Sequence, residues 1–418
     1  MATVTGLSGN TSYSLSVGSN DQNGAAQALA NAISLALANG SLGQQGQTAP
    51  AGTPSFTILS APGTYSLSSA QNAVAIGTGG ASTVFGSGAL GEQILGDNGN
   101  TTLVLRGGSG NVVLGNGNDF VTAAQIGTSG FSINTGAGND TILALGGGNI
   151  VNPGGGNNLV GLGAGQNTVS LSGNDTLYGN ANGGGSETVF GGSGPALVFP
   201  LSSNLYFIGG TGSASIVGGT GSATVFAGTG GTTVGGGSAG FNRLVNAQGG
   251  SATLFGAAQG DLLYATGSGF TIMVAGSGNE TLDGSNSTAN NVFYGSNGPV
   301  GTTGALITGG SGADTIYAGT NSTIRGGAGA DQIIFQAGRT SGTVQVLGFN
   351  PAEKASFQGY AGSNFSTGIV GPGVGTTSGT SVGQTVQVNG VNSTQITLGN
   401  GTTIQFVGVT GLTGSSFN

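Results

Sequence analysis

The sequence contains no cysteine, no histidine and no tryptophan among its 418 residues. A chain without Cys and His cannot form a disulfide, a Ser-His-Asp triad, a Cys-His dyad or a thiolate or imidazole metal site. Charged residues are also scarce, with 5 Lys and Arg against 13 Asp and Glu, a formal net charge of -8. Binding to nucleic acid depends on clustered cations, so we expect no nucleic-acid partner.

Glycine is the abundant residue, with 93 positions, about three times ordinary usage. A composition this rich in Gly is common in disordered linkers. Hydrophobic residues nevertheless make up 36% of the chain and occur along its whole length. We therefore expect an ordered fold with a core, in which Gly occupies tight turns.

Residues 1–45 are expected to form a strand and a helix that cap whatever follows. The first residues contain no basic and apolar segments of the kind found in a cleaved signal peptide. The apolar stretch from Ala25 to Ala38 is too short to cross a bilayer, so no membrane span is expected. Within it, Leu29, Ile33, Ala36 and Leu37 have helical spacing and predict one amphipathic helix. Its start is expected at a cap on Asp21 or Asn23 and its end near Gly40.

A nine-residue repeat dominates the middle of the chain. Six consecutive frames from residue 182 to residue 235 read NGGGSETVF, GGSGPALVF, PLSSNLYFI, GGTGSASIV, GGTGSATVF and AGTGGTTVG. The eighth position is apolar in all six frames: Val189, Val198, Phe207, Ile216, Val225 and Val234. Side chains alternate along a strand, so this position is predicted to point into a core, while the Gly-rich half of each frame turns.

Two such frames make one coil of about 18 residues, and successive coils would pair their strands in parallel. One repeat cannot bury its apolar face, but a stack of coils can. The sequence thus predicts an all-β protein, a parallel β-solenoid over residues 46–340 with roughly 15 coils. Phase slips between blocks predict local bulges and loops.

The frames resemble the calcium-binding nonapeptide G-G-x-G-x-D-x-U-x, with U apolar, of the RTX family of bacterial secreted proteins. The best matches are GGSGADTIY, which contains Asp314, and GGAGADQII, which contains Asp331. Partial matches contain Asp119 and Asp140. The resemblance implies that turn carbonyls and the sixth-position Asp residues of neighbouring coils bind Ca²⁺, which prefers oxygen ligands.

The sixth position departs from this pattern in the long in-phase block. Only Glu187 is acidic there; the other five frames have Ala196, Leu205, Ala214, Ala223 and Thr232. Asp314 and Asp331 lie 17 residues apart, about one coil, and Asp119 with Asp140 forms a second candidate pair. The alternative is that each Asp closes a turn onto its own backbone. That alternative is preferred for Asp175, Glu187 and Glu280.

Residues 341–418 predict a C-terminal β module. Asn400-Gly401 between alternating apolar residues is a strong hairpin signal. This end resembles the C-terminal module of RTX proteins that are exported by type I secretion with an uncleaved C-terminal signal. The resemblance implies an extracellular or cell-surface location. A simple capping module for the solenoid is the alternative, and the two are compatible.

No cluster of acids, bases and cations suggests catalysis, so we expect a protein that is not an enzyme. The nearest acids, such as Glu280 and Asp283, have no cation beside them in the sequence. Exposed solenoid ends are open sheet edges that can pair with other chains. The leading hypothesis is a self-assembling structural protein, a homopolymer that forms a surface filament or S-layer-like sheet. The other hypothesis is a secreted adhesin or biofilm-matrix protein that binds polysaccharide through a solenoid face.

Overall fold

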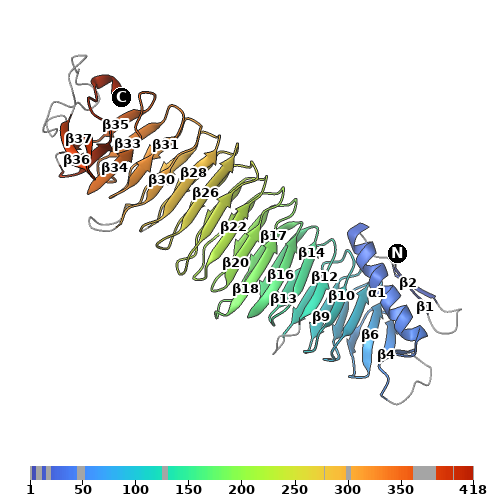
Figure 1. Ribbon diagram of the computed structural model, residues 1–418. Helices are drawn as coiled ribbons and strands as arrows, with labels where there is room; N and C mark the ends of the chain where they lie inside the picture. The colour runs from blue at the N-terminus through green and yellow to red at the C-terminus, as the bar shows by residue number, and fades with distance from the viewer. Residues whose placement is uncertain are drawn as a thin grey trace. The chain divides into compact units, whose positions relative to one another are not determined.

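The computed structural model describes residues 2–5, 12–15, 20–44, 52–124, 130–276, 278–297, 303–360, 383–398 and 400–417. The chain is an all-β solenoid of about 15 turns, built from parallel strands, with one α-helix in the described part (Figure 1). This confirms the predicted fold class. Among these residues, no helix combines the length and the apolar character needed to cross a membrane.

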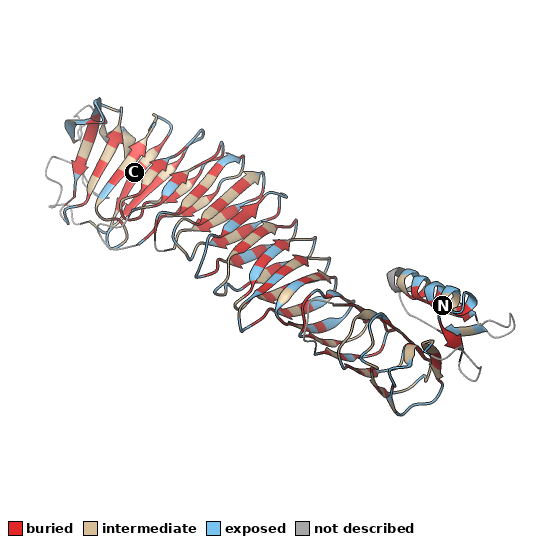
Figure 2. Cartoon of the chain, turned by 60° about the horizontal axis from the view of Figure 1, so that its bottom comes forward, coloured by how far each residue is buried: buried red, intermediate tan, exposed pale blue. Residues whose placement is uncertain are grey.

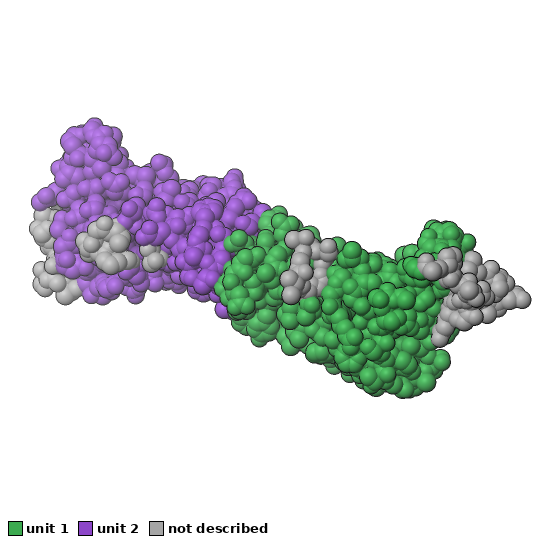
Figure 3. Space-filling view, turned by 90° about the horizontal axis from the view of Figure 1, so that it is seen from below, with its two compact units in different colours: residues 1–213 green, residues 214–418 purple. Residues whose placement is uncertain are grey.

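Each coil contributes one strand to each of two parallel sheets. Sheet I contains β3, β4, the even-numbered strands from β6 onward and β37, and sheet II contains the odd-numbered strands from β5 to β35. The chain separates into two compact units, residues 1–213 and residues 214–418, coloured in Figure 3. Each unit contains strands of both sheets.

In unit 1, sheet II consists of β5 (Thr64–Ser66), β7 (Ser82–Phe85), β9 (Thr101–Leu105), β11 (Phe120–Ala123), β13 (Thr141–Ala144), β15 (Asn157–Leu162), β17 (Asn174–Tyr178) and β19 (Ala196–Phe199). Sheet I consists of β3 (Gly43–Gln44), β4 (Ser55–Leu59), β6 (Gln71–Ile76), β8 (Glu92–Gly96), β10 (Gly110–Val113), β12 (Phe131–Asn134), β14 (Ile150–Gly154), β16 (Gly165–Leu171), β18 (Gly185–Phe190) and β20 (Asn204–Ile208).

In unit 2, sheet II consists of β21 (Ala214–Ile216), β23 (Thr232–Gly235), β25 (Ala252–Phe255), β27 (Thr271–Val274), β29 (Val292–Tyr294), β31 (Thr315–Tyr317), β33 (Gln332–Gln336) and β35 (Lys354–Gln358). Sheet I consists of β22 (Ala223–Ala227), β24 (Arg243–Asn246), β26 (Leu262–Gly267), β28 (Thr281–Ser287), β30 (Leu306–Thr308), β32 (Thr323–Arg325), β34 (Thr343–Leu347), β38 (Thr403–Val407), β37 (Val391–Thr397) and β36 (Gln384–Val388).

The core consists of apolar side chains that stack from strand to strand within each sheet. In sheet I of unit 1, Val151 lies beside Val169, which lies beside Val189, which lies beside Phe207. Figure 2 shows the resulting alternation of buried and less buried residues along the strands. All six eighth-position residues predicted to face inward are at most 2% exposed. Burying each such side chain stabilises the fold by about 1.5–3 kcal/mol.

The N-terminal segment contains the antiparallel pair β1 (Ala2–Thr5) and β2 (Ser12–Leu15) and the helix α1 (Asn20–Ala38). The helix begins at Asn20, close to the predicted caps Asp21 and Asn23, and ends at Ala38 as predicted, with Gly40 at φ +79° in the left-handed conformation that terminates it. Leu29, Ile33 and Leu37 are buried in the hydrophobic cluster that joins the helix to the outer surface of sheet I. The helix is therefore a cap on one outer face of the solenoid.

The C-terminal segment of unit 2 changes from parallel to antiparallel pairing. Strand β38 pairs in parallel with β34 and antiparallel with β37, which pairs antiparallel with β36. Ile396 lies opposite Ile404 across the hairpin that Asn400-Gly401 predicted. A short 3-10 helix, Gly414–Ser416, precedes Phe417, which bridges to Ala355 on β35. This end of sheet II is thus partly covered by the chain itself.

Candidate functional site

Most of the acidic side chains of this protein lie inside the coils. Eleven of the 13 acidic residues are buried: Glu92, Asp97, Asp119, Asp140, Asp175, Glu187, Asp261, Glu280, Asp314, Asp331 and Glu353. Most of them stand one residue before a strand or at its start, two positions before a buried apolar residue. Alternation along the strand then directs both side chains inward. The outer surface consequently carries few negative charges.

In sheet II of unit 1, the sixth-position residues form a hydrogen-bonded column from coil to coil. The backbone N–H of Thr101 donates to Oδ1 of Asp119 at 2.6 Å, and the N–H of Asp119 donates to Oδ1 of Asp140 at 2.8 Å. The N–H of Asp140 then donates to Oδ1 of Asn158 at 2.9 Å. Nδ2 of Asn158 continues the column by donating to Oδ1 of Asp175 at 2.8 Å.

The same arrangement recurs in sheet II of unit 2. The N–H of Thr271 donates to Oδ1 of Asn291 at 3.0 Å, and the N–H of Asn291 donates to Oδ1 of Asp314 at 2.7 Å. The N–H of Asp314 donates to Oδ1 of Asp331 at 2.8 Å. Glu353 occupies the equivalent place on the next coil, because Gln332 and Lys354, which follow Asp331 and Glu353, are partners in the parallel pairing.

The structure therefore brings together both pairs that the sequence singled out. Asp314 and Asp331 lie on adjacent coils, as do Asp119 and Asp140. The turn-closing alternative is also observed: Oδ2 of Asp314 accepts the N–H of Gly310 at 2.7 Å. The carboxylate of Asp314 thus accepts one hydrogen bond from its own turn and one from the preceding coil.

Sheet I has shorter columns of the same kind. Asn149 donates its N–H to Oδ1 of Asn167 at 3.1 Å. Nδ2 of Asn242 lies 3.0 Å from both carboxylate oxygens of Asp261. Glu280 is buried one coil farther, while Asp283, on the other side of the strand, accepts the N–H of Ser285. Glu280 and Asp283 therefore do not form the two-carboxylate arrangement of a glycosidase.

Burial perturbs the acids because it disfavours a charged carboxylate. It raises the pKa of Asp119 to about 8 and the pKa of Asp140 to about 6. It also raises the pKa of Glu187 to about 7, that of Asp331 to about 6 and that of Glu353 to about 7. Several of these carboxyl groups are thus expected to hold a proton near neutral pH.

The carboxylate oxygens of the two Asp pairs are placed better for accepting hydrogen bonds than for binding calcium. Calcium takes six to eight oxygen ligands, but one oxygen of each Asp already faces a backbone N–H, which repels a cation. Within the described residues, Oδ2 of Asp119 and Oδ2 of Asp331 have no hydrogen-bond partner. No group of three or more acidic side chains in the same part of the chain converges on a metal-binding position. Calcium binding at these pairs stays a prediction.

A second column, made of exposed Asn residues, was not predicted. Asn118 donates its N–H to Oδ1 of Asn100 at 2.8 Å, and Asn139 donates to Oδ1 of Asn118 at 2.7 Å. Asn157 donates to Oδ1 of Asn139 at 2.9 Å. These bonds point toward the N-terminal coil, opposite to those of the inner column. The signal in the sequence is the dipeptide Asn-Asp or Asn-Asn, which recurs once per coil in this part of the chain.

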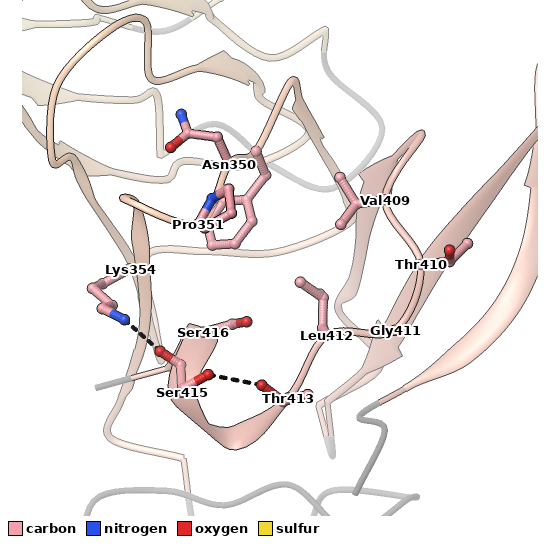
Figure 4. Close-up of a pocket in the computed structure, with 11 residues that line it drawn as sticks. Asn350, Pro351, Lys354, Val409, Thr410, Gly411, Leu412, Thr413, Ser415 and Ser416 are labelled. Atoms are coloured by element: carbon pink, nitrogen blue, oxygen red, sulfur yellow. Dashed lines mark hydrogen bonds between the residues drawn. The ribbon is translucent and has the colours of Figure 1, made fainter. Parts of the chain in front are cut away.

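A pocket of about 290 Å³ lies beside the C-terminal 3-10 helix (Figure 4). Its cation, Lys354, donates a hydrogen bond to the carbonyl oxygen of Ser415. The hydroxyls of Thr413 and Ser415 are hydrogen-bonded to each other at 2.8 Å. The polar groups of the pocket therefore hold the C-terminal segment against β35, which indicates a structural use of the pocket.

No protein-family model and no curated protein sequence matches this chain.

Proposed function

We propose that this protein is a self-assembling extracellular structural protein that forms a surface filament or an S-layer-like sheet. The single observation that carries the proposal is the burial of eleven of the 13 acidic side chains. These side chains are directed into the coils, where many of them accept hydrogen bonds, and burial raises the pKa of Asp119 to about 8 and that of Glu187 to about 7. Identical copies can then approach closely with little electrostatic repulsion between them.

The strands at the ends of the sheets support the same proposal. Among the described residues, β5 pairs only with β7, and β36 pairs only with β37. Neither of these two strands contains a charged residue or Pro, the usual means of blocking an edge, whereas β35 at the other end of sheet II contains Lys354 and is bridged by Phe417. Such strands can accept a strand from another copy, and a head-to-tail contact of this kind produces a filament.

The proposal includes export by type I secretion and a place on the cell surface. The support for these two parts is the likeness of the repeats and of the C-terminal β module to RTX proteins. The proposal assigns no catalytic residue. It includes Ca²⁺ only as an ion bound by the two Asp pairs.

Two stacked aromatic pairs favour self-assembly over the polysaccharide-binding alternative. Tyr178 and Phe199 are partners in adjacent strands, and their rings stack 5.0 Å apart with planes 7° from parallel. Tyr294 and Tyr317 stack in the same way at 4.6 Å. These distances match the spacing between strands, so the rings stand on edge against the sheet. A sugar platform needs ring faces that lie open to solvent.

Light scattering of the purified full-length chain at neutral pH tests the proposal, with and without Ca²⁺. We expect particles far larger than the 39.6 kDa monomer. A monodisperse monomer under both conditions would refute self-assembly.

A further inference from the structure

The chain contains eight Asn-Gly dipeptides, whose asparagines are Asn23, Asn39, Asn98, Asn116, Asn182, Asn297, Asn389 and Asn400. In such a dipeptide the backbone nitrogen of the glycine can attack the side-chain carbon Cγ of the asparagine and displace its amide group as ammonia. Glycine has no side chain to hinder this approach, so the asparagine before it is chemically labile. The fold decides which nitrogen is free to react, because the attack requires rotation of the backbone and removal of the N–H proton.

Two of the described dipeptides have their glycine N–H held by another group. The N–H of Gly99 donates to Oδ1 of Asp97 at 2.9 Å. The N–H of Gly40 donates to the carbonyl oxygen of Leu37 at 3.3 Å. A donated N–H keeps its proton and fixes the backbone that carries it. Both asparagines that precede these glycines are therefore protected in the folded chain.

Three further asparagines are fixed by the structure around them. Asn23 lies within α1. Gly117, which follows Asn116, is buried, and a Cβ added to it would overlap the carbonyl oxygen of Gly99 on the preceding coil. Asn389 lies at φ +50° in the two-residue turn between β36 and β37, and the pairing of these strands holds both sides of the turn. Rotation at these positions would disturb the helix, the stacked coils or the hairpin.

The turn that joins β17 to β18 leaves Asn182 and Gly183 open. Asn182 is exposed, and a Cβ added to Gly183 or to Gly184 meets no atom within 4 Å. Among the described residues, the N–H of Gly183 donates no hydrogen bond. The φ values of Gly183 and Gly184 are +80° and +77°, a conformation that glycine adopts without strain. The nitrogen of Gly183 and the side chain of Asn182 can therefore approach each other.

We propose that Asn182 is a site of spontaneous deamidation. The nitrogen of Gly183 forms a bond to Cγ of Asn182 while the bond between Cγ and Nδ2 breaks, and Nδ2 leaves as ammonia with the proton of the Gly183 N–H. Water then adds to one of the two carbonyl carbons of the resulting succinimide ring and breaks its bond to the ring nitrogen. The product is aspartate or, where the bond to the backbone carbonyl carbon breaks, isoaspartate. The reaction uses water alone and needs no oxidant or reductant.

Both products place a new carboxylate on the outer surface. Eleven of the 13 acidic side chains are buried, so one exposed carboxylate is a large relative change in the charge of that surface. Isoaspartate also lengthens the main chain within the turn. Oδ1 of Asn180 accepts the N–H of Asn182 at 3.1 Å, and Nδ2 of Asn180 donates to the carbonyl oxygen of Gly183 at 2.5 Å. A longer main chain moves these two partners apart, so we expect isoaspartate to weaken the turn.

Site-resolved mass spectrometry of the full-length chain tests the assignment. The protein is incubated at mildly alkaline pH, folded in buffer and unfolded in guanidinium chloride, and the peptides that contain Asn182 and Asn98 are followed over time. Conversion of each amide to a carboxylate is read from the peptide mass, and isoaspartate from enzymatic methylation. Asn98 is the matched control, since it is also exposed and precedes glycine, but the N–H of that glycine is donated to Asp97.

In the unfolded chain the two sites should react at similar rates, because both are Asn-Gly. In the folded chain Asn182 should keep a rate close to its unfolded value, while Asn98 should slow by about tenfold or more, because it reacts only when its turn opens. Asp97→Ala removes the acceptor of the Gly99 N–H and should accelerate the reaction at Asn98 in the folded chain. If circular dichroism shows that Asp97→Ala does not fold, the comparison of the two sites in the wild type still decides.

A folded wild type in which Asn182 reacts no faster than Asn98, or is slowed as strongly as Asn98, would overturn the assignment. Either result leaves the proposed function standing. The inference goes beyond self-assembly and does not rest on it, because the reaction needs only one chain.

Discussion

The backbone N–H of Asp314 donates a hydrogen bond of 2.8 Å to Oδ1 of Asp331, which stands one coil later in the chain. Both residues are 1% exposed. One oxygen of each Asp is therefore needed as an acceptor, while its negative charge is costly inside the coil. The hydrogen bond that Oδ1 accepts can therefore be tested separately from the charge of the carboxylate.

Asp331→Asn should preserve stability at neutral pH, and Asp331→Ala should lower it. The Asn side chain keeps the oxygen that accepts the N–H of Asp314 and removes the charge. The Ala side chain leaves a buried N–H without a partner, at a cost of about 1–3 kcal/mol. Chemical denaturation at pH 7 measures both variants, and equal losses would contradict the structural role assigned to Oδ1.

Glu187→Gln should flatten the dependence of stability on pH. Burial raises the pKa of Glu187 from 4.5 to about 7 in the folded state. The folded state then binds the proton more tightly than the unfolded chain, so this stabilisation is full below about pH 4.5 and is lost as pH rises through about 7. The loss amounts to at most about 3 kcal/mol.

Thermal unfolding between pH 4 and pH 9 measures this effect. The wild type should unfold at a lower temperature at pH 9 than at pH 5, and Glu187→Gln should lose part of that difference. Asp283→Asn, at a position outside the columns, is the control. A wild-type stability that rises steadily from pH 5 to pH 9 would show that the buried acids are ionised without cost.

Gly154→Ala and Gly156→Ala should destabilise the chain, whereas Gly155→Ala should not. Gly154 and Gly156 have φ values of +75° and +114°, and an added Cβ would lie 1.7 Å from the carbonyl oxygens of Gly136 and Gly138. The left-handed conformation alone costs an Ala residue about 1–2 kcal/mol. An added Cβ at Gly155 meets no atom within 4 Å. Melting temperatures compare the three variants, and a uniform effect would contradict the close stacking of these turns.

The resemblance to RTX repeats predicts calcium at Asp314 with Asp331, and at Asp119 with Asp140. Isothermal titration calorimetry with CaCl₂ at neutral pH should show a small number of sites per chain. The double variant Asp314→Asn/Asp331→Asn should lose one class of site, and Asp175→Asn should lose none. If titration of the wild type releases no heat, calcium does not bind at these Asp pairs.

The repeat allowed much of the fold to be predicted. Position eight of each frame is an inward residue, as Val189 and Val225 show, and the spacing of Asp314 and Asp331 is one coil. The helix was predicted correctly at its C-terminal end because Gly40 marks it. Its start was predicted slightly late, at a cap on Asp21 or Asn23, because Asn20–Gly24 lacks apolar residues at helical spacing.

The inward direction of the acids was not predicted. Alternation places position six on the same side of the strand as position eight, so the signal was present in the frames, but the likeness to calcium-binding turns favoured the other interpretation. The cover of α1 on sheet I could not be predicted. It depends on packing between segments that are distant in sequence, which no repeat encodes.

Negative-stain electron microscopy of the full-length protein at neutral pH shows directly whether copies of the chain assemble. We expect filaments or sheets with a regular repeat. Separate single particles at every protein concentration, with and without calcium, would contradict this expectation.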